Sequence, residues 1–350
     1  MPRFTTVALV AGAALLVRRA VRGRMSTAPL WPMPALDVPV SGYGRGSTVP
    51  RKVLVAGRTT PADGVVELRL EGAGLPAWQP GAHIDLVLPS GLVRQYSLCG
   101  DPADPTSYTV ATRLIEDGQG GSREVHERLQ EGVEIEIRGP RNRFPLVDSP
   151  AYVFVAGGIG ITPVLPMLRA AEAAGADWRL VYCGRSRATM PYLTEIEALG
   201  GDRVTVVAED ESGFPELEFL AHLPEGTAVY CCGPDGLMDA VGAAMPEGRA
   251  PRLERFTAAA TTGGTAFEVE LRRSGRTLTV AADQSLLSAV RDELPGLAYS
   301  CRQGFCGTCR QRVLEGEIDH RDELLTDDER DGSMLICVSR CAGKRLVLDL

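Results

Sequence analysis

A chain of 350 residues has room for two or three domains, each with its own hydrophobic core. Hydrophobic residues make up 44% of the sequence and charged residues 23%, which is typical of globular proteins. The formal net charge of −8 argues against nucleic acid as a partner and permits docking on a basic protein surface.

The first residues combine an apolar run with basic residues. Residues 4–17 are mostly Ala, Val and Leu, four arginines follow by residue 24, and no acidic residue precedes Asp37. The run is short for a bilayer span, and a secretory signal would carry its charges first, so we expect a cytoplasmic protein. Three interpretations of residues 4–24 stay open: a peripheral or re-entrant membrane anchor, a disordered extension, or translation that starts at Met25. Residues 1–47 end in a Pro- and Gly-rich linker.

Short apolar alternations separated by turn residues characterise residues 48–148. Strands are predicted over 53–55, 64–70, 83–88, 94–98 and 108–113, with a helix over 123–129. Several short strands at this spacing predict an antiparallel β-barrel.

Two motifs inside this barrel suggest a ligand. Arg94 and Tyr96 share one face of a strand, which suits a flat ring with a phosphate tail, although surface packing explains such pairs more often. Residues 118–122 are Gly-Gln-Gly-Gly-Ser at the start of the predicted helix, where free N–H groups bind anions and Ser122 is expected to cap. An ordinary glycine-rich turn is the alternative. Arg113 supplies a second positive charge nearby.

Residues 149–257 alternate apolar strands with helices. Strands are predicted over 152–156, 178–183, 203–207 and 227–232, and helices over 165–174, 192–199 and 237–245. This pattern predicts a parallel sheet covered on both faces, with ligands at the carboxyl ends of its strands.

Two loops at that edge carry glycines. The first is Gly-Gly-Ile-Gly-Ile-Thr-Pro over residues 157–163, in which Thr162 is expected to cap and Pro163 suits the first helical turn. The second is Cys232-Gly233-Pro234. The first loop is not the G-x-G-x-x-G fingerprint, but both allow close approach of a pyrophosphate.

The C-terminal domain is predicted over residues 266–350, after an Ala-, Thr- and Gly-rich linker over 258–265. Its predicted elements are strands over 267–271 and 277–280, a helix over 285–293, a cysteine loop and a last strand over 345–350.

The cysteine loop has the spacing C-x4-C-x2-C…C, formed by Cys301, Cys306, Cys309 and Cys337. This is the spacing of a plant-type [2Fe–2S] cluster. Gly304 and Gly307 permit positive φ and close approach of backbone amides to the sulfurs. A structural zinc site is the alternative, although such sites usually pair one C-x2-C with another. The other cysteines lie mostly in apolar runs, which predicts buried thiols in a reducing compartment.

These motifs, together with Asp-His-Arg-Asp at 319–322, resemble the ferredoxin–NADP reductase superfamily, and within it the phthalate dioxygenase reductase and vanillate demethylase reductase group. The resemblance covers about residues 50–350 and includes the domain order. It implies a multidomain fold: an antiparallel β-barrel for flavin, an α/β parallel-sheet domain for nicotinamide and an α+β β-grasp ferredoxin domain.

The resemblance also implies cofactors and the residues that bind them. For FMN they are Arg94, Tyr96, Ser97, Ala111, Thr112, Arg113, Gln119, Gly120, Gly121, Ser122, Thr162 and Phe256. For NAD they are Gly157, Gly158, Gly160, Thr162, Pro163, Arg185, Cys232, Gly233 and Pro234. Tyr96 is expected to pack on the isoalloxazine, Ser97 to reach flavin N5 if the strand bends there, and Phe256 to lie against the ring. The Gly-Gly-Ser cradle favours FMN over FAD.

The implied function is an NADH-dependent reductase that passes electrons through FMN and a [2Fe–2S] cluster to a Rieske-type terminal oxygenase. A cytochrome P450 is the alternative acceptor. NADPH is the alternative donor, since the segment 183–187 has two arginines and no acid. The non-enzymatic alternative is an iron–sulfur redox sensor or a zinc-stabilised module. No general acid or base is expected, because the chemistry belongs to the cofactors.

Overall fold

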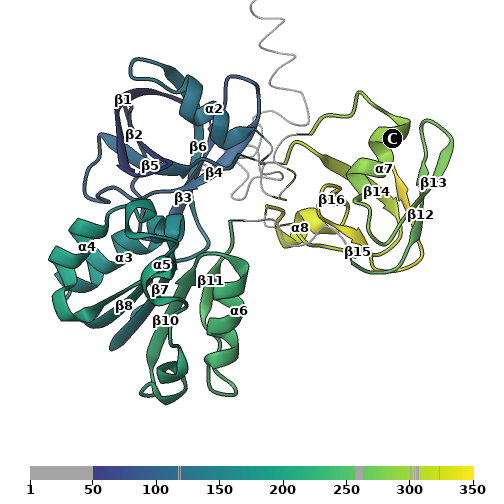
Figure 1. Cartoon of the computed structure of the whole chain (residues 1–350). Helices are drawn as coiled ribbons and strands as arrows, with labels where there is room; N and C mark the ends of the chain where they lie inside the picture. The colour runs from purple at the N-terminus through teal and green to yellow at the C-terminus, as the bar shows by residue number, and fades with distance from the viewer. Residues whose placement is uncertain are drawn as a thin grey trace, which may run out of the picture. The chain divides into compact units, whose positions relative to one another are not determined.

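The computed structural model describes residues 50–116, 118, 120–256, 263–299, 302, 304, 307–322 and 324–350 (Figure 1). The predicted N-terminal segment over residues 1–47 lies outside this part of the chain, as does most of the predicted linker over 258–265.

The first described domain is a six-stranded antiparallel sheet around one apolar core (Figure 1). In the order β4-β3-β6-β1-β2-β5, its strands are β4 (Val93–Ser97), β3 (Ala82–Val87), β6 (Glu134–Asn142), β1 (Arg51–Ala62), β2 (Val65–Glu71) and β5 (Ser107–Arg113). A bridge between Leu98 and Val110 links the two outer strands, which closes the barrel. Helix α2 (Gly121–Arg128) follows β5.

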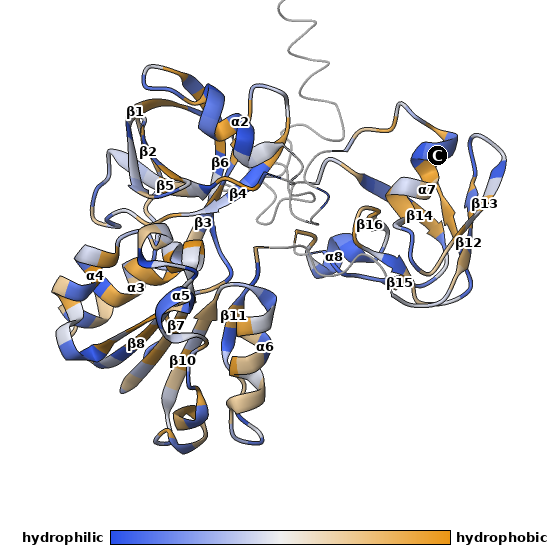
Figure 2. Cartoon of the chain, viewed as in Figure 1, coloured by the Kyte–Doolittle hydropathy of each residue, from blue (hydrophilic) through white to orange (hydrophobic). Residues whose placement is uncertain are grey.

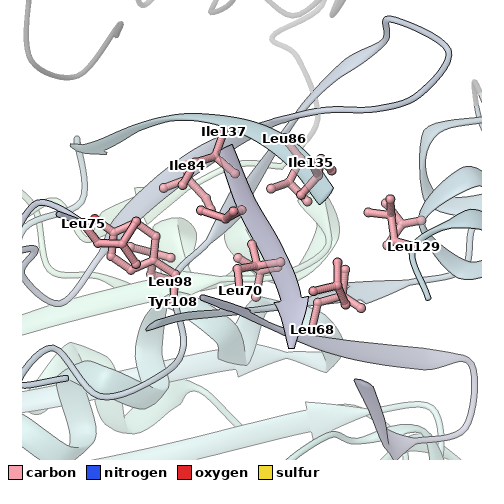
Figure 3. Packing of buried hydrophobic residues seen from close by; sticks show 14 of the residues in the cluster. Leu68, Leu70, Leu75, Ile84, Leu86, Leu98, Tyr108, Leu129, Ile135 and Ile137 are labelled. Atoms are coloured by element: carbon pink, nitrogen blue, oxygen red, sulfur yellow. The ribbon is translucent and has the colours of Figure 1, made fainter. Parts of the chain in front are cut away.

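Alternation along the strands fills the barrel, as predicted. Leu68 and Leu70 on β2, and Ile135 and Ile137 on β6, are 4% exposed or less, and Figure 3 shows their side chains directed into a shared core. Side chains two residues apart lie on the same face of a strand, so each strand contributes one apolar row to the interior.

The second domain is a five-stranded parallel sheet in the order β11-β10-β7-β8-β9. Its strands are β7 (Ala151–Gly157), β8 (Asp177–Gly184), β9 (Val204–Ala208), β10 (Thr227–Cys232) and β11 (Arg252–Glu254). Its helices are α3 (Ile161–Ala173), α4 (Leu193–Gly200), α5 (Glu209–Ser212) and α6 (Asp235–Ala244), with short 3-10 turns η1 (Gly158–Gly160), η2 (Arg187–Thr189), η3 (Gly201–Arg203) and η4 (Glu218–His222).

Separate apolar clusters cover the two faces of this sheet, which confirms the predicted architecture. Figure 2 shows α3 as largely hydrophobic, in keeping with the burial of most of its residues. The chain runs from β7 outward to β8 and β9, and then returns to place β10 on the other side of β7. The carboxyl end of β7 is therefore the switch point where ligands of such sheets bind.

The C-terminal domain is a mixed sheet with a helix packed on it (Figure 1). In the order β13-β12-β18-β14-β16, the strands are β13 (Arg276–Val280), β12 (Phe267–Leu271), β18 (Arg345–Leu348), β14 (Arg310–Glu315) and β16 (Ser333–Leu335). The pair β15 (Ile318–Asp319) and β17 (Arg340–Cys341) and the helices α7 (Leu286–Glu293) and α8 (Asp327–Arg330) complete it. Ser285 caps α7 by accepting from the Ser288 amide at 3.1 Å, which fixes the start of the helix.

One buried histidine in the barrel has an altered pKa. His83 on β3 is 3% exposed, and its Nδ1 has no hydrogen-bond partner among the residues described. Burial, with Arg141 and Arg143 nearby, lowers the pKa of His83 from 6.5 to about 3.

We predict that His83 makes the barrel acid-sensitive. Below pH 6.5 the unfolded chain protonates this histidine whereas the folded chain does not until about pH 3, so stability is lost as the pH falls through this window. The contribution amounts to about 2 kcal/mol between pH 6.5 and 5. Urea unfolding at both pH values should show a smaller loss in His83→Gln than in the wild type; equal losses would contradict the assignment.

Candidate functional site

Two cations of the barrel lie where the sequence predicted a phosphate. Arg94 on β4 packs across Gly121 at the start of α2, where an ideal Cβ would meet Arg94 Nε at 2.5 Å. Arg113, at the end of β5, is half-buried like Arg94, and neither has a carboxylate partner among the described residues. A half-buried guanidinium group without a carboxylate partner, beside a helix N-terminus as Arg94 is, fits the phosphate of FMN.

The glycine motif adopts the expected backbone, but its serine has a different role. Gly120 precedes α2 with φ of 83°, in the left-handed region that favours glycine. Ser122 does not cap the helix, because it lies one residue inside it and its hydroxyl accepts from the Ile115 amide at 3.0 Å. Ser122 therefore fastens the loop between β5 and α2. Gln119 lies outside the described residues.

Tyr96 and Ser97 lie at the end of β4. Tyr96 packs against the barrel core, and burial raises the pKa of its hydroxyl to about 12. Strand β4 ends at Ser97, whose hydroxyl lies 3.5 Å from a carboxylate oxygen of Glu254 at the end of β11. The structure thus brings Ser97 beside the parallel sheet and adds Glu254, which the sequence did not single out.

Two further FMN candidates, Ala111 and Thr112, are buried on β5, at 4% and 3% exposed. Phe256, two residues after β11, is 41% exposed. Its predicted contact with a flavin ring stays a prediction.

The two glycine loops of the parallel sheet touch each other. An ideal Cβ at Gly160 would overlap the carbonyl oxygen of Cys232, and one at Gly157 would meet Pro234 Cδ at 2.6 Å. A Cβ at Gly233 would meet the backbone of Gly157 at 3.0 Å. A Cβ does not fit at Gly157 or Gly160 and would be crowded at Gly233, and the resulting bare backbone can approach a pyrophosphate.

Thr162 does not cap α3. The sequence predicted that this helix begins at residue 165, but it begins at Ile161. The Thr162 hydroxyl donates to the carbonyl of Ile159 at 2.9 Å, so it closes the turn from within. Pro163 lies in the first turn of the helix, as expected. The buried thiol of Cys232 has a pKa well above its usual value because burial disfavours the thiolate.

The barrel and the nicotinamide loop meet at Gly158. Its φ is 54°, and an ideal Cβ there would lie 3.6 Å from Nη1 of Arg113. The predicted phosphate-binding cation and the predicted pyrophosphate loop are therefore neighbours.

Acidic residues that the sequence did not single out follow β9, next to the segment 183–187 where the adenosine end of the nicotinamide site was predicted. Strand β8 pairs with β9 in register from Leu180 to Gly184, so Arg185 and Glu209 leave the sheet side by side. The Asp210 amide donates to the Arg185 carbonyl at 3.1 Å. Arg187 is ion-paired with Glu197. Three consecutive carboxylates, at residues 209–211, thus lie next to the arginine segment.

Two of the four predicted cluster ligands are described, and they lie together. Cys309 and Cys337 are 2% and 3% exposed and share one apolar cluster. The antiparallel pairing of Arg310 with Leu335 brings the two cysteines to the same end of β14 and β16. Cys301 and Cys306 lie outside the described residues. Soft thiol donors without solvent access fit an iron–sulfur cluster.

The cysteine loop has the backbone that its glycines predicted. Gly304 and Gly307 have φ of 79° and 76°. A Cβ at Gly304 would press on Val338 Cγ2 at 2.8 Å. Asp322 lies next to this loop, since a Cβ at Gly304 would come within 3.2 Å of its Cα, and its buried carboxylate accepts from the amides of Leu324 and Leu325 at 3.2 and 2.8 Å.

Among the described residues, no helix is long and apolar enough to cross a bilayer. The predicted membrane-associated segment, residues 4–24, lies outside them.

Comparisons with known proteins agree with these features. Residues 154–242 match the model of the oxidoreductase NAD-binding domain, and residues 269–342 that of the 2Fe-2S iron-sulfur cluster binding domain. The toluene-4-sulfonate monooxygenase system reductase subunit TsaB1 of Comamonas testosteroni is 39% identical over 312 residues, which are 85% of this chain and 98% of that protein.

Two solved structures are similar over most of the chain. Phthalate dioxygenase reductase, described as a modular structure for electron transfer from pyridine nucleotides to [2Fe-2S], has a TM-score of 0.63 and 34% identity, covering 85% of this chain and 97% of that one. An intact type IV self-sufficient cytochrome P450 monooxygenase has a TM-score of 0.69 and 38% identity, covering 93% of this chain and 45% of that longer chain.

We predict that Gly160→Ala destabilises the parallel-sheet domain, because its Cβ would collide with the Cys232 carbonyl and the backbone of both loops must move. The expected cost is about 1–3 kcal/mol, measured by urea unfolding. Gly236→Ala on α6 is the matched control, since a Cβ there meets nothing within 4 Å. Equal stability of the two variants would show that the loops are not tightly packed.

Proposed function

Because this chain belongs to the phthalate dioxygenase reductase family, we propose that it takes electrons from NADH and passes them through FMN and a [2Fe–2S] cluster to a terminal oxygenase. The observation that carries the proposal is the proximity of Arg113, on the barrel, to Gly158, in the first glycine loop of the parallel sheet. When bound, FMN supplies the conversion of a two-electron donor into the single electrons that a [2Fe–2S] cluster carries.

The residues of the chain bind and orient these groups. Arg94, Arg113 and the start of α2 would hold the FMN phosphate by charge and by backbone N–H groups. Gly157, Gly160 and Gly233 would admit the pyrophosphate of the coenzyme, since no side chain separates it from the backbone. Cys301, Cys306, Cys309 and Cys337 would hold the iron pair.

The acceptor is best assigned as a Rieske-type oxygenase. The similarity to phthalate dioxygenase reductase supports a dioxygenase as the acceptor, because the match covers 85% of this chain and 97% of that one. A cytochrome P450 is the second candidate, favoured by the similarity to a chain that contains its own P450. The acidic net charge of this protein suits an acceptor with a basic docking face.

NADH is the proposed donor in preference to NADPH. Glu209 and Asp210 follow β9 directly and lie beside Arg185 in the neighbouring segment. A carboxylate at this position can accept hydrogen bonds from the ribose hydroxyls of NADH and repels the 2′-phosphate of NADPH. Arg187, the other cation of this segment, is engaged by Glu197. The neighbouring strand thus supplies the acid that the segment 183–187 lacks.

We predict that neutralising both carboxylates weakens the preference for NADH. In Glu209→Gln/Asp210→Asn the ratio of kcat/KM for NADPH to that for NADH should rise about tenfold, through loss of like-charge repulsion. The ratio is measured by ferricyanide reduction. Asp202→Asn, at the opposite end of β9, is the control and should leave the ratio unchanged. A shift of equal size in the control would reject the assignment.

We predict that Cys337→Ser separates the two halves of the electron path. The variant should lose its cluster absorbance and at least about 90% of its cytochrome c reduction, because one of four ligands is missing, and should retain NADH-dependent ferricyanide reduction at the flavin. Cys341→Ser, four residues further on and outside the ligand pattern, should behave as the wild type. Parallel loss of both activities in Cys337→Ser would contradict the proposed path.

A further inference from the structure

Tyr192 has a backbone conformation that tyrosine rarely adopts. It precedes α4 with φ of 62° and ψ of 13°, in the left-handed region. Arg302 is the only other non-glycine residue with positive φ in the part of the chain that the structure describes. Such strain persists where surrounding contacts hold the residue in place.

The side chain of Tyr192 reaches from the parallel-sheet domain into the barrel. Its hydroxyl donates to Oε2 of Glu67 on β2 at 2.6 Å and lies 3.4 Å from Sγ of Cys99. Its ring packs on a small apolar cluster of barrel residues that includes Val65 and Ala111. Burial raises the pKa of the Tyr192 hydroxyl, so the group remains a protonated donor.

Two further bonds join the domains beside Tyr192. The Asp63 amide, in the turn between β1 and β2, donates to the Ala188 carbonyl at 2.9 Å. On α3, Arg169 donates to the carbonyls of Cys99 and Gly100 at 3.0 and 3.1 Å and is ion-paired with Glu195.

The junction is not a continuous apolar core. A cleft of about 850 Å³ opens between the domains and is lined by Glu67, Cys99, Arg169, Tyr192 and Glu195. Because apolar packing across this cleft is incomplete, the hydrogen bonds of Tyr192, Asp63 and Arg169 contribute more to fixing the angle between the domains.

Pro191, which directly precedes Tyr192, is connected to the loop over residues 157–163 through the side chain of Tyr182. The hydroxyl of Tyr182 on β8 lies 2.9 Å from the Pro191 carbonyl and 3.2 Å from the Gly158 carbonyl. Gly158 in turn lies against Arg113 of the barrel. The loop that faces the coenzyme and the Tyr192 contact are thus joined by one buried side chain.

We propose that Tyr192 and Glu67 are positioning residues for hydride transfer, which set the distance between the flavin site of the barrel and the nicotinamide site of the parallel sheet. The inference rests on the proposed function. Hydride transfer needs its reacting atoms about 3–3.5 Å apart, and small displacements reduce the rate steeply. A phenylalanine would fill the same apolar cluster, so the hydroxyl is the group that adds orientation.

The test compares Tyr192→Phe with Tyr152→Phe in the full-length, FMN-loaded protein. Tyr152 is the matched control because it is another buried tyrosine of the second domain whose hydroxyl donates to a carbonyl, that of Val147 at 2.9 Å, in the segment between β6 and β7 and not on a barrel strand. The first readout is hydrogen exchange of the Asp63 amide, which reports opening of the junction without any turnover.

In Tyr192→Phe the Asp63 amide should exchange about five- to tenfold faster, and flavin reduction by NADH in an anaerobic stopped flow should slow about tenfold with little change in KM for NADH. Glu67→Ala should show the same faster exchange and slower flavin reduction as Tyr192→Phe. Glu67→Gln should approach the wild type, because its amide oxygen can still accept from Tyr192.

Wild-type exchange and wild-type flavin reduction in Tyr192→Phe would overturn the inference, as would equal changes in Tyr152→Phe. Failure of the proposed function gives a different result. In that case NADH would not reduce the flavin even in the wild type, whereas the exchange comparison would still decide whether Tyr192 holds the junction.

Discussion

The structure depends on the contact between two backbone turns at the carboxyl ends of β7 and β10. Gly160 lies so near the opposite turn that no side chain fits there, and a side chain at Gly233 would be crowded against the backbone of Gly157. This contact is possible only because the two strands are parallel neighbours in register, from Thr227 paired with Ala151 to Cys232 paired with Ala156. It leaves bare backbone at the switch point of the sheet, which is where a pyrophosphate can be bound through N–H groups.

The second domain, which contains this contact, is also packed against the barrel. Gly158 lies against Arg113, Tyr192 donates to Glu67 on β2, and Glu254 lies beside Ser97, so the second domain meets the barrel at several places. The chemistry of such a reductase belongs to its bound groups, and the contribution of the chain is to hold them at fixed separation. The polar character of the junction suits this task, because directional hydrogen bonds define an angle more sharply than a small apolar patch does.

Much of the fold could be predicted because local patterns and packing agree. The alternation over residues 267–271 gave strand β12 with its bounds, and the glycine motifs of all three domains were recognised. The predictions failed where spatial neighbours decide. Strand β6 contains Gly139-Pro140, which interrupts its pattern, and the roles of Glu254, Glu209 and Tyr192 depend on strand register or on an unusual φ. Ser122 and Thr162 were expected to cap helices, but the start of each helix shifted by a few residues.

The proposed function requires the barrel, the parallel sheet and the C-terminal domain to form one path for electrons. The most direct measurement mixes the oxidised protein with NADH under anaerobic conditions and follows the flavin and iron–sulfur absorbances separately in time. The account predicts that the flavin absorbance falls first and that the cluster absorbance then falls at a rate independent of protein concentration. Loss of flavin absorbance with a cluster that stays oxidised, or a second phase that accelerates with protein concentration, would contradict it.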